Sequence, residues 1–173
     1  RDISDYDVLM QHRLKILKQH GLKLSDIQAV IATMDPLDGA LEFLDWLRSV
    51  TQILVVSDTF VQFAGPLMQK LGFPTLLCNS LAVAADGTID NYVMRQKDGK
   101  KRAAQAMQSL NYTVIGVGDS YNDIAMLQAA DHGILYRPPE NVRRQYPAFP
   151  VASGFDELKG MIQSIIGSEG GGR

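Results

Sequence analysis

Hydrophobic and polar positions along the chain change their period near residue 50. Before that point, apolar residues recur at helical spacing among Lys, Gln and His, which predicts amphipathic helices. The first helix is expected to stop at Gly21. The second is expected to start at Ser25, because Gln28 three residues later completes a capping-box pattern. The three predicted helices cover residues 6–20, 25–34 and 39–50.

After residue 50, short apolar runs alternate with helical segments. The run QILVVS is continuous and rich in β-branched residues, as expected for a strand that is buried on both faces. Asp86-Gly87 lies between two alternating runs and predicts a hairpin near 80–94. Further strands are predicted at 75–78, 113–118 and 132–136, and further helices at 61–72, 100–110, 122–130, 139–146 and 155–166.

This alternation predicts an α/β fold with a Rossmann-like parallel sheet flanked by helices, preceded by a small helical cap. We expect the cap in residues 1–38, the core domain in 39–166 and a flexible tail in 167–173. Ligands of such sheets lie beyond the carboxyl ends of the strands.

Ser57 ends the first apolar run and precedes a predicted helix. A hydroxyl at this place can donate to an oxyanion, next to backbone N–H groups that also favour anions. On this stretch alone, the preferred interpretation is that Ser57 or Asp58 is only the N-cap of the helix. A serine nucleophile is disfavoured, because Val55 occupies the first glycine position of the G-x-S-x-G elbow.

The stretch VIGVGDSYNDIAML places two acids and an amide at another strand end. Gly118 would let a ligand approach the backbone. Asp119 could be one ligand of a hard divalent cation such as Mg²⁺. Asp123, one helical turn on, could brace that site, and Asn122 could donate to a phosphate. The alternative is that Asp119 or Ser120 merely caps the next helix.

The stretch QKDGKKRAAQ places lysines at a helix start, where the helix dipole disfavours them. On this stretch alone, a solvated charge cluster is preferred over a nearby anion.

The overall charge and cysteine content narrow the classes of partner. The formal net charge is −2 and the basic residues are spread out, so no nucleic-acid surface is expected. The single cysteine, Cys78, fits a reducing compartment, and no apolar run approaches the ~18 residues of a membrane span. We therefore expect a cytoplasmic protein without a membrane partner.

The ordered set of a strand-end serine, a lysine and GDSYND resembles the haloacid dehalogenase-like phosphatases. In this resemblance Ser57 corresponds to the second motif of the family and Lys100 to the third, with Lys97 or Lys101 as alternatives. Asp119 and Asp123 correspond to the fourth motif. The resemblance implies a Mg²⁺ cofactor held by Asp119, with Asp123 supporting the site without binding the metal itself.

The stretches SDTF, LGFPTLLCN, RQKD and PENV are similar to the phosphoserine phosphatase branch, and most similar to its bifunctional phosphoserine phosphatase and homoserine phosphotransferase group. The similarity implies phosphoserine as a small-molecule substrate, with a role in serine biosynthesis. Arg13 in the cap would hold the substrate carboxylate, which suits a guanidinium. Ser57, Asp58, Lys100 and Asn122 would bind the phosphate and the rest of the substrate.

The first motif of that family is an Asp-x-Asp or Asp-x-Glu at a strand end, which supplies the nucleophile. No such motif follows an apolar strand in this sequence. Asp5-Tyr6-Asp7 follows RDIS rather than an apolar strand, so we interpret it as an acidic helix start. The nucleophile and its strand, a central one in the family's sheet, are expected upstream of residue 1. We therefore expect a fragment of a longer protein; a nicked form and a natural truncation with little activity are the alternatives.

Two other classes of function stay open at this stage. A degenerate phosphatase that binds phosphate without turnover would also keep the anion-binding residues. A receiver-like signalling domain fits less well, because its acids come early in the chain and it has no helical segment of about 50 residues before its sheet. The oligomeric state is open, with a homodimer compatible with an exposed cap.

Overall fold

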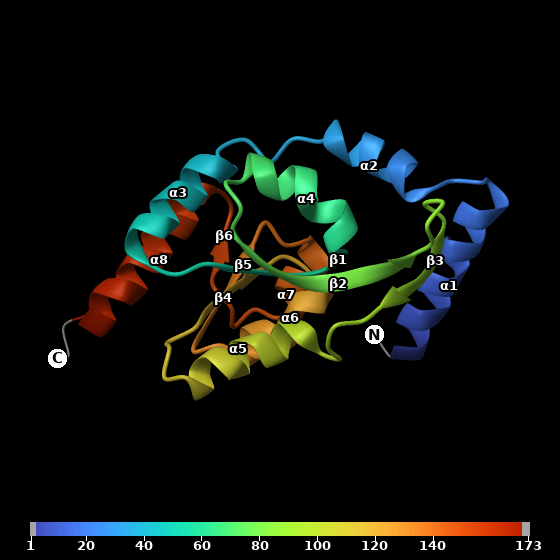
Figure 1. Ribbon diagram of the computed structural model, residues 1–173. Coiled ribbons are helices and arrows are strands. Elements are labelled where there is room, and N and C mark those ends of the chain that lie inside the picture. Colours follow the sequence, from blue (N-terminus) through green and yellow to red (C-terminus); the bar gives the residue numbers. More distant parts are fainter. Residues whose placement is uncertain (1–2, 171–173) are drawn as a thin grey trace. The chain divides into compact units, whose positions relative to one another are not determined.

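A computed structural model describes residues 3–170, and the side chains of residues 6–168 (Figure 1). Helices and strands alternate over most of this range. The helices are α1 (Ile3–Gln19), α2 (Leu24–Ala32), α3 (Ala40–Val50), α4 (Val61–Lys70), α5 (Gly99–Ser109), α6 (Tyr121–Ala129), α7 (Glu140–Gln145) and α8 (Phe155–Gly170). The strands are β1 (Leu54–Phe60), β2 (Thr75–Val83), β3 (Ile89–Val93), β4 (Ile115–Gly118), β5 (His132–Tyr136) and β6 (Val151–Ala152).

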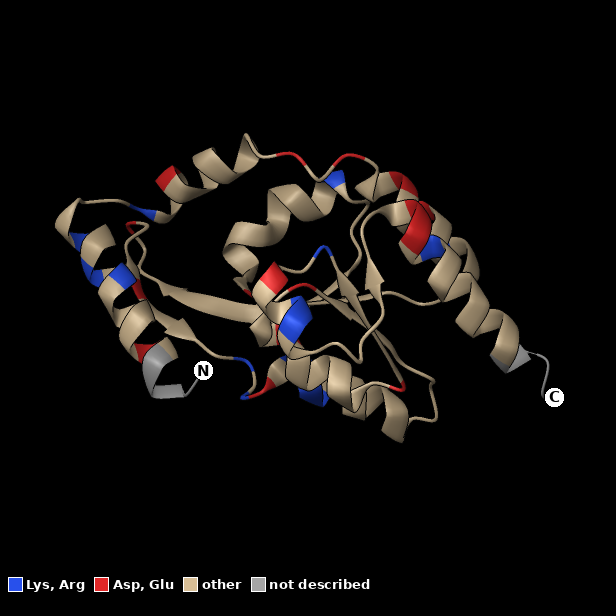
Figure 2. Cartoon of the chain, turned by 180° about the vertical axis from the view of Figure 1, so that it is seen from behind, with Lys and Arg blue, Asp and Glu red and all other residues tan. Residues whose placement is uncertain are grey.

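Acidic and basic residues are spread over many elements of the chain (Figure 2). Helix α1 carries residues of both signs, whereas α5 carries basic residues only. Between residues 3 and 170, no helix combines the length and the apolar character that a membrane crossing requires.

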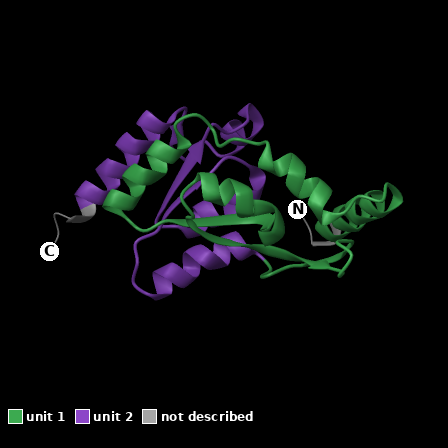
Figure 3. Ribbon diagram, turned by 45° about the horizontal axis from the view of Figure 1, so that its top comes forward, with its two compact units in different colours: residues 1–97 green, residues 98–173 purple. Residues whose placement is uncertain are grey.

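The chain forms two compact units, residues 1–97 and residues 98–173 (Figure 3). Their boundary falls inside the segment 39–166 that the sequence predicts as the core domain. At the other end, α8 continues to Gly170 and so reaches into the predicted flexible tail.

The first unit contains a mixed sheet in the order β1-β2-β3. β1 and β2 are parallel and joined by α4, and β2 and β3 form the predicted hairpin, in which Ser80 pairs with Val93. β2 is longer than the predicted strand 75–78, because its second half continues into the antiparallel pairing with β3. α4 packs on β1 and β2, and α1 packs on β3.

β1 differs from the strand expected in this place. In the described part of the chain β1 is an edge strand that pairs only with β2, and the side chain of Leu54 is 39% exposed. The prediction of a strand buried on both faces is wrong here, because only Phe60 of the seven residues of β1 is buried. β1 also continues past Ser57 as far as Phe60.

The ends of the first two helices follow local backbone chemistry. Gly21 ends the α1 turn with a φ of +63°, a conformation that glycine adopts without steric cost. The N-cap of α2 is Lys23 rather than the predicted Ser25. The reason is that the Asp26 carboxylate accepts a hydrogen bond from the Lys23 backbone N–H at 2.8 Å, which satisfies an amide at the helix start.

The apolar faces of α1 and the first sheet form one core. Its buried members are Met10, Leu14, Phe60, Leu81 and Ile89. α1 is thus packed on the sheet of its own unit through Met10 and Leu14, whereas Val8, Leu9 and Ile16, which the helical spacing also predicts as apolar positions, are exposed.

The second unit contains a parallel sheet in the order β4-β5-β6. α6 connects β4 to β5, and α7 lies between β5 and β6, as in successive βαβ units. β6 has two residues, too few for a periodic pattern, and was not predicted. Leu127 and Leu135 are almost fully buried in the core of this unit.

Candidate active site

Ser57 lies within β1 and not at its end. β1 runs to Phe60, and α4 begins at Val61 with Phe60 as its N-cap. The interpretation of Ser57 or Asp58 as an N-cap is therefore wrong. The Ser57 hydroxyl oxygen accepts a hydrogen bond from the Thr59 backbone N–H at 3.2 Å, which leaves the hydroxyl hydrogen to be donated elsewhere.

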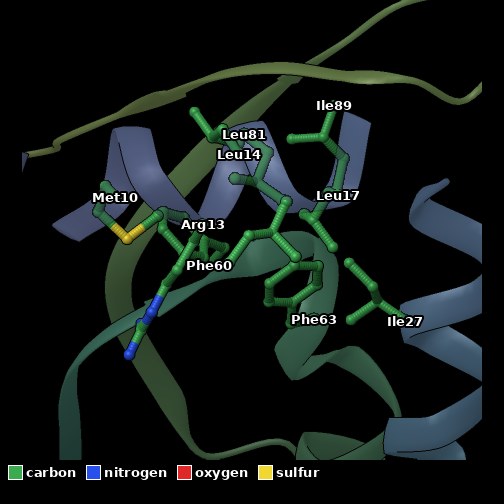
Figure 4. A pocket seen from close by; sticks show the side chains of 10 residues that line it. Met10, Arg13, Leu14, Leu17, Ile27, Phe60, Phe63, Leu81 and Ile89 are labelled. Atoms are coloured by element: carbon green, nitrogen blue, oxygen red, sulfur yellow. The ribbon is translucent and has the colours of Figure 1, made fainter. Parts of the chain in front are cut away.

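Arg13 lies on α1 at the margin of an apolar cavity of about 250 Å³ in the first unit. The guanidinium points away from the rings of Phe60 and Phe63 (Figure 4). Arg13 is exposed, so its positive charge faces solvent rather than the apolar side chains of the cavity. This position suits the recognition of an anion. Apolar side chains make the cavity walls: Met10, Leu14, Ile16, Leu17, Ile27, Phe60, Phe63, Leu81 and Ile89.

Asp119 and Asp123 meet where β4 ends and α6 begins. One carboxylate oxygen of Asp123 accepts the backbone N–H of Asp119 at 3.0 Å and that of Ser120 at 3.1 Å. The same oxygen accepts the Ser120 hydroxyl at 3.1 Å. Ser120, not Asp119, is the N-cap of α6. Asp123 therefore fixes the backbone that carries Asp119.

Glycine is required at position 118 for a different reason from the one that the sequence suggests. A Cβ at this position would lie 2.3 Å from Cβ and 2.6 Å from Cγ of Asp123. The space beside the Gly118 backbone is thus taken by the Asp123 side chain rather than left for a ligand. Only glycine lets the Asp123 carboxylate reach the amides of Asp119 and Ser120.

Lys100, near the start of α5, donates to the second carboxylate oxygen of Asp123 at 2.7 Å. The side chains of Lys100 and Asp123 are only 17% and 9% exposed, so this is a shielded ion pair and not a solvated cluster. Lys97 and Lys101, the alternatives for the third motif, are both exposed. Lys100 is thus the lysine of the three that contacts the acid pair.

The two acids have pKa values that move in opposite directions. Although Asp119 reaches solvent, partial burial of its carboxyl raises its pKa, and the negative charge of Asp123 raises it further. Burial also acts to raise the pKa of Asp123, but its hydrogen bond and charge interaction with Lys100, together with the two backbone amides, lower the pKa below its ordinary value. Asp123 is therefore held as a carboxylate. The ionised form of Asp119 would be stabilised by a nearby cation.

The donor set at this strand end fits a hard cation. Both oxygens of Asp123 are already engaged, so Asp119 is the carboxylate that can take a metal, and Mg²⁺ binds through one or two carboxylates plus water and phosphate oxygens. No three His, Cys, Asp or Glu side chains gather in metal-binding geometry within the described part of the chain. A complete protein-only cage is therefore not formed by these residues.

The second unit thus brings Lys100, Asp119 and Asp123 together, with Asn122 exposed in the first turn of α6. The other predicted site residues lie in the first unit; they are Arg13, Ser57 and Asp58.

Of the Asp5-Tyr6-Asp7 stretch, Asp7 accepts a hydrogen bond from the Tyr92 hydroxyl, and the side chain of Asp5 lies outside the described residues. Sequence reasoning missed the buried Asn79, whose signal was an amide inside the apolar run TLLCNSLAV.

Polar groups at the carboxyl end of a parallel strand lie where open α/β sheets bind their ligands. The profile of the haloacid dehalogenase-like hydrolases matches residues 5–131. This match covers most of the sequence, and the chain belongs to the haloacid dehalogenase-like hydrolase family.

Two curated relatives align with nearly all of this chain. One, a phosphoserine phosphatase of Pseudomonas syringae, is 56% identical over 159 residues, which are 92% of this chain and 67% of the relative. The other, phosphoserine phosphatase ThrH of Pseudomonas aeruginosa, is 55% identical over 159 residues, which are 92% of this chain and 78% of that relative. A solved phosphoserine phosphatase from T. onnurineus has the same fold, with a TM-score of 0.64 at 21% identity, over 85% of this chain and 70% of that one.

Proposed function

We propose that this chain carries a large part of a Mg²⁺-dependent phosphoserine phosphatase. The observation that supports it most is the shielded Lys100–Asp123 pair, which orders the backbone at Asp119 while leaving the Asp119 carboxylate able to take a cation. The substrate class comes from the relatives, which share more than half of the aligned residues and are named phosphoserine phosphatases.

Each proposed site residue has a separate task. Arg13 binds the carboxylate of phosphoserine, because a guanidinium stays charged and can form two parallel hydrogen bonds. The Ser57 hydroxyl and the Lys100 ammonium stabilise negative charge on the phosphoryl oxygens. Asp58 and Asn122 complete the polar surroundings of the substrate. Bound Mg²⁺, held by Asp119 with water and phosphate oxygens, would offset further negative charge.

The reaction proceeds by covalent catalysis. A carboxylate attacks phosphorus, the bond from phosphorus to the serine oxygen breaks, and that oxygen takes a proton from a neighbouring acid. Water then attacks the acyl phosphate, which releases inorganic phosphate and restores the carboxylate. The nucleophile belongs to the first motif of the family, which the sequence resemblance predicts upstream of residue 1. Transfer to the hydroxyl of homoserine in place of water stays a prediction of the same resemblance, as do the cytoplasmic location and the homodimer.

The test measures phosphate release from phosphoserine with Mg²⁺, on this chain and on the chain preceded by the upstream residues that the prediction requires. Asp119→Asn is expected to abolish Mg²⁺-dependent release, and Ser57→Ala to slow it more than about tenfold, since one oxyanion donor is worth about 10²–10³ in kcat. Asp156→Asn and Ser49→Ala are matched controls, because both residues are exposed on helices.

Near-normal rates in both site variants would refute the assignment. Binding of phosphoserine without turnover in every form would instead support the non-catalytic binding module.

A further inference from the structure

We propose that Asn79 is a positioning residue that holds the Ser57 hydroxyl in its donating orientation. The inference rests on the proposed function of Ser57. Asn79 lies in β2 and is only 8% exposed, one of two buried polar residues in the described part of the chain. A buried amide is costly unless its hydrogen bonds are satisfied, so its partners indicate its purpose.

The pairing of β1 with β2 is interrupted opposite Cys78. Val56 pairs with Leu77, and the next pair is Phe60 with Asn79. Three residues of β1, 57–59, therefore stand against one residue of β2, a bulge larger than the usual single extra residue. Such a bulge re-aims side chains but leaves backbone groups outside the ladder that need other partners.

The Asn79 side chain satisfies one of these groups and bonds a second backbone group outside the bulge. Its amide nitrogen donates to the Asp58 backbone carbonyl at 3.3 Å, and its amide oxygen accepts the Arg95 backbone N–H at 3.0 Å. Asn79 thus connects the bulge to the segment after β3.

The bond to Asp58 fixes the middle of the bulge. On one side of Asp58 is Ser57 and on the other is Thr59, whose N–H donates to the Ser57 hydroxyl oxygen. With the carbonyl of Asp58 held by Asn79, the Thr59 N–H stays directed at that oxygen. Because the oxygen then accepts from the chain, its own hydrogen is the part left to meet a phosphoryl oxygen.

Amide hydrogen exchange tests the geometry without any assay of activity. In Asn79→Asp, the carboxylate can still accept from Arg95 but cannot donate to Asp58, so exchange at the Thr59 amide should rise about tenfold or more while the Arg95 amide is unchanged. Asn91→Asp, an exposed asparagine of the same sheet, should change neither amide.

Unchanged exchange at Thr59 in Asn79→Asp would overturn the proposal. If this variant does not fold, Asn79→Ala replaces it: faster exchange at both amides supports the proposal, and an unchanged Thr59 amide contradicts it.

A double-mutant cycle on phosphoserine hydrolysis tests the link to Ser57. Asn79→Asp should lower kcat about tenfold with KM within about twofold, since misplacing a catalytic group by about 1 Å can cost up to about a hundredfold. In the Ser57→Ala background the same change should cost less than about twofold.

Equal losses in both backgrounds would mean that Asn79 acts only on the fold, and would overturn the positioning role. If the chain preceded by the predicted upstream residues does not release phosphate at all, the proposed function fails, and hydrogen exchange alone decides whether Asn79 holds the bulge.

Discussion

Replacing Gly118 by alanine tests the packing that builds the acid site. The added Cβ would lie 2.3 Å from Cβ, 2.6 Å from Cγ and 2.9 Å from Oδ2 of Asp123. Ordinary contacts between such atoms need ~3.5–4 Å, so the Asp123 side chain must move by more than about 1 Å. That movement breaks the alignment of its hydrogen bonds with the Asp119 and Ser120 amides and with Lys100.

The expected cost follows from these contacts. Overpacking typically costs about 1–3 kcal/mol, and a hydrogen bond to a charged group contributes about 1.5–3 kcal/mol. We expect Gly118→Ala to lower the free energy of unfolding by about 3 kcal/mol, which lowers Tm by about 6–12 °C in a chain of this size.

The assay is urea unfolding followed by circular dichroism, with Gly160→Ala as the matched control. A Cβ at Gly160 of α8 meets no atom within 4 Å, so this change should be neutral or stabilising by up to ~1 kcal/mol. A Gly118→Ala protein as stable as Gly160→Ala would refute the packing argument.

Three further changes test other contacts. Lys100→Ala leaves its carboxylate partner buried without a cation and should destabilise the fold by about 3–5 kcal/mol, whereas Lys101→Ala, an exposed control, should stay within about 0.5 kcal/mol in the same unfolding assay. The hydrogen bond to Asp7, and burial after it, raises the pKa of Tyr92 to about 12, so this phenol favours the folded state below pH 10 and the gain is lost as the pH rises through about 12. Asp7→Asn should return that pKa toward 10, and an ultraviolet titration that still shows a tyrosine ionising near 12 would contradict this. Arg13→Ala should raise KM for phosphoserine but not for phosphoethanolamine, which lacks the carboxylate; equal effects on both would exclude Arg13 from carboxylate recognition.

The acid site at the end of β4 could be predicted because its signal is local. An apolar strand, a glycine and two acids one helical turn apart are all contained in one short stretch, so the strand end and the helix start follow from neighbouring residues. The predicted role of Asp123 in bracing a metal site stays a prediction; its hydrogen bonds to two amides show that it orders the backbone at Asp119. The reason for Gly118 could not be foreseen, because it depends on where the Asp123 side chain turns.

The features that escaped prediction depend on distant partners. β1 passes Ser57 because the bulge is held by β2 and by Asn79, whose position in sequence is about twenty residues away. β2 is long because it pairs with a different strand at each end. The Lys23 cap of α2 was missed for a different reason: Asp26, only three residues away, accepts from the Lys23 amide, and from the sequence alone a cap at Ser25 is equally reasonable.

The central claim is tested most directly by the initial rate of phosphate release from phosphoserine, measured with saturating Mg²⁺, after addition of EDTA, and after Mg²⁺ is restored. The protein is this chain preceded by the upstream residues in which the family resemblance predicts the nucleophile. We predict release that stops with EDTA and returns with Mg²⁺. No release in any condition, or release that EDTA does not change, would contradict the assignment of a magnesium-dependent phosphoserine phosphatase.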